Sequence, residues 1–175
     1  TMHDDMQFEP VTTRAMRDAV APDRDSRYSV IGWGNRSGEH RQTGKGLRIF
    51  AWLGALTVME SHLRAQPTVE AGGFLLGVRG IEADGSPFVA IQETLPAGHG
   101  IGTAVSFTFT HDAWSALARE RRQRFPDLEI CGWYHSHPGW GVFLSEQDRF
   151  VHRHFFPGIQ DVACVFDPQR NAIGW

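Results

Sequence analysis

The sequence predicts an α/β fold (α+β mixed) in which a central mixed β-sheet is flanked by helices. Short apolar runs, typical of buried strands, alternate along the chain with longer segments whose apolar residues recur at helical spacing. The chain has 175 residues, of which 41% are hydrophobic. This is enough for one globular domain with a substantial core.

The first part of the chain differs in composition from the rest. Residues 1–45 are polar and rich in arginine and aspartate, and we expect them to form an N-terminal extension of unknown role. Within it, residues 13–20 could form a short helix and residues 27–33 a short strand, whereas residues 34–46 have the composition of a mobile loop. The main domain is expected at residues 46–175, and its last strand stops with the chain, which suggests trimming near the domain end.

The clearest helical pattern covers residues 51–66 and follows a short strand that starts at Leu47. Its apolar positions recur at steps of three and four residues, and Pro67 ends it because proline cannot continue a helix. These apolar positions are Leu53, Leu56, Met59 and Leu63.

Further along, strands and helices continue to alternate. A turn at residues 84–87 predicts that the strands on either side of it form a hairpin. Thr110 stands where it can cap a helix, and residues 95–105 have the composition of a mobile loop. The strands are expected at residues 71–78, 88–94, 106–110, 128–134, 161–166 and 172–175, and the helices at 112–124 and 145–155.

Charge and composition argue against several classes of partner. The formal net charge is -3, so nothing indicates a nucleic-acid surface. No apolar run approaches transmembrane length and no signal peptide is visible, so we expect a soluble, cytoplasmic protein that does not act in a membrane. The two cysteines, Cys131 and Cys164, lie in apolar runs and are expected to be buried core residues.

A group of chemically useful side chains follows the strand expected at residues 128–134. His135 and His137 are two residues apart, so in extended backbone they point to the same side. Ser145 opens the next helix, and Asp148 lies in its first turn. Two histidines and one carboxylate are three protein ligands that leave the fourth position of a zinc ion open, as in catalytic sites.

Each of these residues also has an ordinary structural explanation. Ser145 with Asp148 three residues later is close to a capping box, and an acidic residue in a first turn suits the helix dipole. His135 and His137 could be ordinary strand residues, and Glu70 could be a surface carboxylate before a strand. Taken one at a time, these explanations are stronger than a functional one.

Taken together, the residues resemble a known signature. His135-Ser136-His137, then seven residues, Ser145, two residues and Asp148, with Glu70 upstream, is similar to the motif of the JAMM (MPN+, JAB domain) zinc metalloproteases. The chain resembles a prokaryotic, deubiquitinase-like member of this family. The likeness covers roughly residues 47–175. It extends inside the motif to Pro138–Gly141 and Phe143–Leu144, and outside it to Glu70–Gly77 and Asp161–Pro168.

The resemblance implies a mechanism. His135, His137 and Asp148 would bind one catalytic Zn2+, and Glu70 would act as general base on a water at the fourth zinc position. Ser145 would donate a hydrogen bond to the developing oxyanion. The implied fold is an MPN/JAB-like mixed sheet flanked by helices, and residues 46–175 would be the catalytic domain.

The resemblance also implies a substrate. Members of the family cleave after the C-terminal Gly-Gly of ubiquitin or a ubiquitin-like protein, so such a modifier, its conjugates and the enzymes of an associated conjugation system are the expected partners. Its tail could add to the expected strand at Ser106, Phe107 and Thr108, and Trp140 and Phe143 could wall the glycine channel.

Three alternatives remain open. The same chemistry could act on a ubiquitin-like precursor, or on a carrier-protein conjugate in sulfur metabolism. The chain could also be a modifier-binding MPN module that needs a partner for activity or has none.

Overall fold

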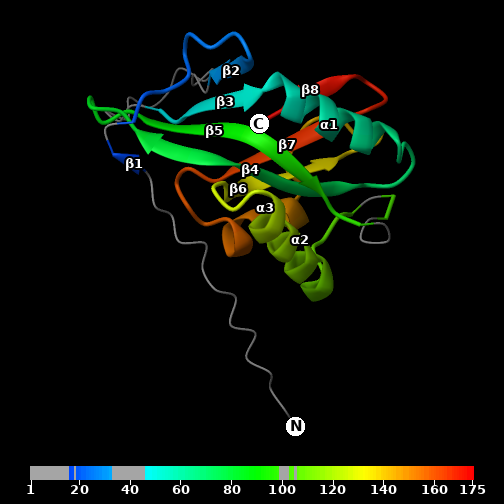
Figure 1. The fold of residues 1–175 in the computed structure, drawn as a ribbon. Coiled ribbons are helices and arrows are strands. Elements are labelled where there is room, and N and C mark those ends of the chain that lie inside the picture. Colours follow the sequence, from blue (N-terminus) through cyan, green and yellow to red (C-terminus); the bar gives the residue numbers. More distant parts are fainter. Residues whose placement is uncertain (1–15, 18, 33–45, 99–102, 105) are drawn as a thin grey trace.

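A computed structural model describes residues 16–17, 19–32, 46–98, 103–104 and 106–175 (Figure 1). In these residues an eight-stranded mixed sheet is combined with three helices, so the expected fold class is confirmed. The elements are β1 (Met16–Arg17), β2 (Tyr28–Gly32), β3 (Arg48–Trp52), α1 (Leu53–Arg64), β4 (Gly72–Ile81), β5 (Pro87–Pro96), α2 (His111–Arg124), β6 (Glu129–Ser136), α3 (Glu146–Phe155), β7 (Val162–Asp167) and β8 (Ala172–Gly174).

The sheet combines antiparallel and parallel neighbours. Its strand order is β2-β3-β5-β4-β6-β7-β8, and β1 pairs with β4 outside this path. The expected hairpin is confirmed, because β4 and β5 pair antiparallel, whereas β3 with β5 and β6 with β7 pair parallel. Strand β6 therefore lies inside the sheet, between β4 and β7, and its C-terminal end is held from both sides.

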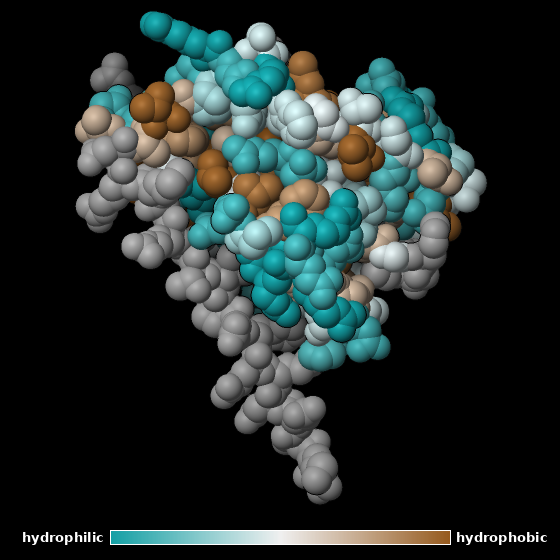
Figure 2. All heavy atoms as spheres, viewed as in Figure 1, coloured by the Kyte–Doolittle hydropathy of each residue, from teal (hydrophilic) through white to brown (hydrophobic). Residues whose placement is uncertain are grey.

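Helices cover both faces of the sheet (Figure 1). Met59 and Leu63 of α1 pack on one face, and Leu117 of α2 and Val151 of α3 pack on the other. The prediction that Leu53 faces the core is wrong, because its side chain is 51% exposed at the first position of α1. On the surface shown in Figure 2, apolar side chains lie singly or in small groups among polar ones.

Strand β6 contains a bulge. Leu75 of β4 pairs with Gly132, but the next residue, Leu76, pairs with Ile130, so Cys131 is an extra residue without an opposite partner. A bulge of this kind bends the strand and interrupts the regular alternation of its side chains.

The bulge decides which way the end of β6 faces. Cys131 packs on the α1 face, whereas Trp133, two residues later, packs on the face covered by α2 and α3. His135 follows Trp133 onto that face, with the two rings stacked at 4.5 Å. Glycine is required at position 132, where φ is 148° and an added Cβ would lie 1.9 Å from the carbonyl oxygen of Val162.

The described N-terminal residues belong to the same sheet. The expected strand at residues 27–33 is confirmed as β2, which pairs with β3. The expected helix at residues 13–20 is wrong where it can be judged, because Met16–Arg17 forms β1 and pairs with Gly80 and Ile81 of β4. The sheet thus includes strands from both sides of the expected boundary at residue 46, and most of the expected loop at residues 34–46 lies outside the described residues.

The region before α2 also differs from expectation. Residues 106–110 do not form a strand, and only Phe107 makes an isolated β-bridge. The side chains of Phe107 and Phe109 are instead buried in the core beneath α2, which holds the backbone away from regular pairing. Thr110 caps α2 as expected, because its hydroxyl accepts the backbone N–H of Ala113. Of the expected loop at residues 95–105, residues 99–102 and 105 lie outside the described part.

None of the helices in the described part of the chain is long and apolar enough to cross a membrane.

Candidate metal centre and active site

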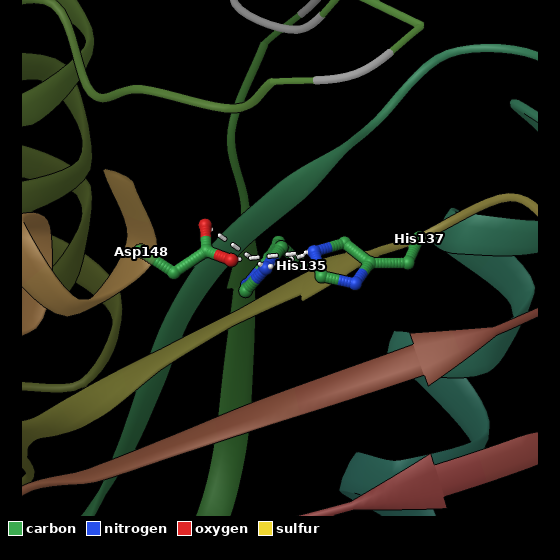
Figure 3. A group of neighbouring side chains, drawn as sticks. All are labelled: His135, His137 and Asp148. Carbon is green, nitrogen blue, oxygen red and sulfur yellow. Dashed lines mark hydrogen bonds and ion pairs between the residues drawn. The ribbon is translucent and has the colours of Figure 1, made fainter. Parts of the chain in front are cut away.

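Three side chains converge where β6 ends (Figure 3). The Nε2 atoms of His135 and His137 are 3.0 Å apart. Asp148, in the first turn of α3, places Oδ1 3.3 Å from Nε2 of His135 and Oδ2 3.3 Å from Nε2 of His137. All three side chains are buried, so the sequence-predicted ligands share one point inside the protein.

This arrangement fits a tetrahedral cation. Zinc binds histidine nitrogen and carboxylate oxygen at about 2.0–2.2 Å, which in tetrahedral geometry separates neighbouring ligand atoms by about 3.3 Å. The observed separations of 3.0–3.3 Å agree with this value. The Nε2 atoms of His135 and His137 face this common point, and in the described residues their Nδ1 atoms have no hydrogen-bond partner.

The charges at the centre also suit a cation. Burial would raise the pKa of Asp148, but hydrogen bonds from His135 and His137 outweigh burial and hold it well below its usual range. Burial lowers the pKa of His135 and favours its neutral, metal-binding form. At His137 burial acts in the same direction, but Asp148 and Glu70 outweigh it and raise the pKa. A buried anion beside imidazole nitrogens is what a divalent cation would neutralise.

Glu70 lies directly before β4 and faces the same point. Its Oε1 is 3.8 Å from Nε2 of His137, and its side chain is 5% exposed. Burial is the main cause that raises the pKa of Glu70 to about 7; Asp148 adds to the rise and His137 opposes it. A carboxyl group with this pKa can accept and release a proton near neutral pH.

Ser145 fixes the start of α3. Its hydroxyl oxygen accepts the backbone N–H of Asp148 at 3.1 Å, and Asp148 Oδ2 accepts the backbone N–H of Ser145 at 2.7 Å. This is the capping box expected from the sequence. Because the hydroxyl oxygen is the acceptor in this contact, its proton is left for another partner.

A small pocket of about 150 Å³ opens beside the centre. The exposed aromatic side chains of Trp140 and Phe143 form part of its wall, and the Phe143 ring lies 4.6 Å from that of His137. The pocket is lined by Glu70, His137, Trp140, Phe143 and Ser145. A larger, mainly apolar cavity of about 490 Å³ also contacts Phe143 but none of the three predicted metal ligands.

The other three expected substrate contacts do not line this pocket. Phe107 is 2% exposed, and its ring lies parallel to that of His135 at 6.5 Å, so it supports a ligand rather than facing solvent. Ser106 is half-buried and its hydroxyl contacts that of Thr103 at 2.7 Å, whereas Thr108 is exposed.

Two residues near the centre were not predicted from the sequence. Ser136 lies between the two histidines, and its hydroxyl oxygen accepts the backbone N–H of Ala71 at 3.0 Å. Asp167 lies at the end of β7, and its carboxylate accepts the backbone N–H groups of Gly139 and Gly141 at 3.0 and 2.8 Å. An Asp-Pro pair signals a turn, but no sequence signal indicates these distant partners.

Comparison with known proteins agrees with the site. Residues 54–166 match the family described as prokaryotic homologs of the JAB domain. The chain is 33% identical over 122 residues to the ubiquitin carboxyl-terminal hydrolase RPN11 of Saccharomyces cerevisiae, which is 69% of this chain and 38% of that protein. It is 31% identical over 125 residues to COP9 signalosome complex subunit 5b of Arabidopsis thaliana, 67% of this chain and 32% of that protein. The chain therefore spans less than half the length of these relatives.

A solved structure shares the fold. The solution structure of protein DSY2949 from Desulfitobacterium hafniense superposes with a TM-score of 0.54 at 20% sequence identity. The match covers 70% of this chain and 79% of that one.

Proposed function

The chain belongs to the family of prokaryotic homologs of the JAB domain, and from this premise we propose that it is a zinc-dependent isopeptidase. Its substrate would be a ubiquitin-like modifier joined through a C-terminal glycine to an amine. The observation that carries the proposal is the convergence of His135, His137 and Asp148 on one buried point beside the carboxylate of Glu70. The name of the yeast relative, a ubiquitin carboxyl-terminal hydrolase, supports the same substrate class.

His135, His137 and Asp148 would hold the zinc ion. When bound, the ion would supply Lewis acidity, which lowers the pKa of water and polarises a carbonyl group. The bulge in β6 and the capping box of α3 support this proposal, because they lie in the two elements that carry the three side chains.

Glu70 would handle the proton. Its carboxylate, buried next to the metal ligands and with a pKa raised to about 7, would take a proton from the attacking water and return it to the departing amine. Ser145 lines the same pocket and would donate its hydroxyl proton to the developing oxyanion. Ser145 would thus both cap α3 and stabilise the oxyanion.

The shape of the pocket favours glycine at the cleaved bond. Trp140 and Phe143 form part of the wall of the pocket of about 150 Å³, and a tail without side chains could lie against both rings. A C-terminal Gly-Gly passes through such a space with its backbone alone, which would separate ubiquitin-like tails from ordinary peptides.

The test is hydrolysis of a modifier-Gly-Gly isopeptide reporter, with ubiquitin and candidate ubiquitin-like proteins as the modifier. Three samples are compared: wild type, wild type with a zinc chelator, and Glu70→Gln. We expect turnover in the untreated wild type only, with zinc retained by Glu70→Gln. Glu60→Gln is the matched control, because Glu60 lies on α1, where its side chain is 40% exposed and pairs only with Arg64 among the described residues.

Turnover that survives both the chelator and Glu70→Gln would refute the proposal. A linear precursor reporter in the same assay separates processing of a modifier from removal of it, because only the conjugate carries a lysine amine as leaving group.

A further inference from the structure

The backbone that carries Glu70 is held by hydrogen bonds from two other segments. The N–H of Glu70 donates to the carbonyl oxygen of Thr103 at 2.7 Å. The next N–H, that of Ala71, donates to the hydroxyl oxygen of Ser136 at 3.0 Å. The two N–H groups on either side of the Glu70 Cα–C bond are therefore both fixed from outside β4.

The hydroxyl of Ser136 replaces a backbone group in the sheet. In an antiparallel ladder, every second pair of opposed residues exchanges both of its N–H···O bonds. Ala71 and Ser136 lie opposite each other, one position beyond the pair formed by Gly72 and His135. One of the two hydrogen bonds expected between them is normal, because the Ser136 N–H donates to the Ala71 carbonyl oxygen at 2.9 Å. In the other, the Ala71 N–H donates to the hydroxyl oxygen of Ser136 instead of to its carbonyl oxygen.

This replacement occurs where β6 leaves β4. Immediately after Ser136, the N–H of His137 donates to the carbonyl oxygen of Phe166 in β7 at 2.9 Å. The chain thus turns towards β7 as it delivers the second histidine, and the hydroxyl keeps the Ala71 N–H paired at that point. Ser136 is completely buried, so water cannot replace the hydroxyl if it is removed.

The carboxylate of Glu70 depends on this backbone for its position. In the described residues its carboxylate lies 3.8 Å from Nε2 of His137 and is repelled by Asp148, and no hydrogen bond to the carboxylate holds it in place. A displacement of about 1 Å at a reacting group can cost roughly 100-fold in rate. The peptide unit next to Glu70 therefore controls a distance that matters for the reaction.

We propose that Ser136 is a positioning residue for Glu70: its hydroxyl holds the Ala71 N–H and so keeps the Glu70 carboxylate facing His137. Ser136 itself contacts neither metal nor substrate in this role. The inference rests on the proposed function of Glu70 as general base. It assigns a positioning role to the residue that lies between the two histidines.

The test compares Ser136→Thr with Ser136→Val. These two variants have nearly the same shape, but only threonine retains a hydroxyl to accept from Ala71. We expect Ser136→Val to lower kcat by roughly 10- to 100-fold while KM and zinc affinity, measured by chelator competition, stay within about twofold of wild type. Ser136→Thr should recover most of the lost kcat, and Ser136→Ala, which adds no bulk, should behave like Ser136→Val.

A second measurement needs no substrate. Hydrogen exchange of the Ala71 amide, followed by NMR, should be slow in wild type and Ser136→Thr and at least roughly tenfold faster in Ser136→Val and Ser136→Ala. An inactive wild type would refute the proposed function. The contact between the Ser136 hydroxyl and the Ala71 N–H would then be tested by hydrogen exchange of Ala71 alone. An active wild type with equal kcat in Ser136→Thr and Ser136→Val, or equal Ala71 exchange in both, would overturn the role of Ser136.

Discussion

Asp167 is the residue whose replacement tests most directly how the loop after the histidines is held. Its carboxylate is completely buried at the end of β7. Oδ1 accepts the backbone N–H groups of Gly139, Gln169 and Arg170, and Oδ2 accepts the N–H of Gly141. Asp167→Asn keeps the shape and the Oδ1 contacts but places an amide NH2 where Oδ2 was.

The expected loss of stability follows from the contacts at Oδ2. The N–H of Gly141 loses a hydrogen bond to a charged acceptor, worth about 1.5–3 kcal/mol, and instead faces another donor. The Arg170 side chain also loses its contact with Oδ2 at 2.9 Å, but it is 56% exposed and contributes little. We expect Asp167→Asn to lower the free energy of unfolding by about 3 kcal/mol at pH 7.

The pH dependence has a definite sign. Burial would raise the pKa of Asp167, but hydrogen bonds from Arg170 and from the N–H groups of Gly139 and Gly141 outweigh burial and hold it well below its usual range. In the unfolded chain an aspartate has a pKa of about 3.9, so as the pH falls the unfolded state takes up the proton first. The stabilisation is therefore complete above about pH 5 and is lost progressively below about pH 4.

Urea unfolding at several pH values measures both effects. With a urea dependence of about 2 kcal/mol per molar, the midpoint of Asp167→Asn should fall by about 1.5 M at pH 7. The gap between wild type and variant should narrow as the pH is lowered from 5 to 3, because asparagine does not titrate. A gap below about 0.5 M at pH 7, or one that stays constant down to pH 3, would refute the account of Asp167 given by the structure.

Three further outcomes follow from other parts of the molecule. Zinc at 100 times its Kd should stabilise wild type by about 2.7 kcal/mol in thermal unfolding and leave His135→Ala unchanged; equal stabilisation of both would place the metal elsewhere. Arg79→Leu should cost about 3–5 kcal/mol in urea unfolding, because it leaves the buried carboxylate of Asp161 without its partner, whereas the exposed Arg124→Ala should cost under about 0.5 kcal/mol. Trp140→Ala should raise KM for the Gly-Gly reporter several-fold with little change in kcat, and a fall in kcat alone would contradict its place as a pocket wall.

The sequence was most informative where local chemistry determines structure. The capping box of Ser145 and Asp148 and the cap at Thr110 depend on residues three positions apart, and both were predicted correctly. The candidate metal ligands were named from a spacing that resembles a known signature, and the structure brings their three side chains together.

The failures have a common physical cause, which is tertiary contact between distant segments. Residues 106–110 alternate like a strand, but Phe107 and Phe109 are taken into the core beneath α2. Nor does any local pattern indicate that the Ser136 hydroxyl accepts a hydrogen bond from Ala71, 65 positions earlier in the chain. Local patterns contain no information about such partners, and the strand formed by Met16–Arg17 is a further example, because it depends on pairing with β4.

The bulge in β6 determines at which positions the strand can change its length. Ile130 and Gly132 are opposite neighbouring residues of β4, Leu76 and Leu75, so a strand without Cys131 would keep all its pairs and leave Trp133 and His135 on the face of α2 and α3. A deletion between Gly132 and His135 would instead turn the two histidines to the α1 face, because side chains alternate along a regularly paired strand. In aligned relatives, a gap at position 131 is therefore compatible with the candidate metal centre, whereas a gap at position 133 or 134 is not.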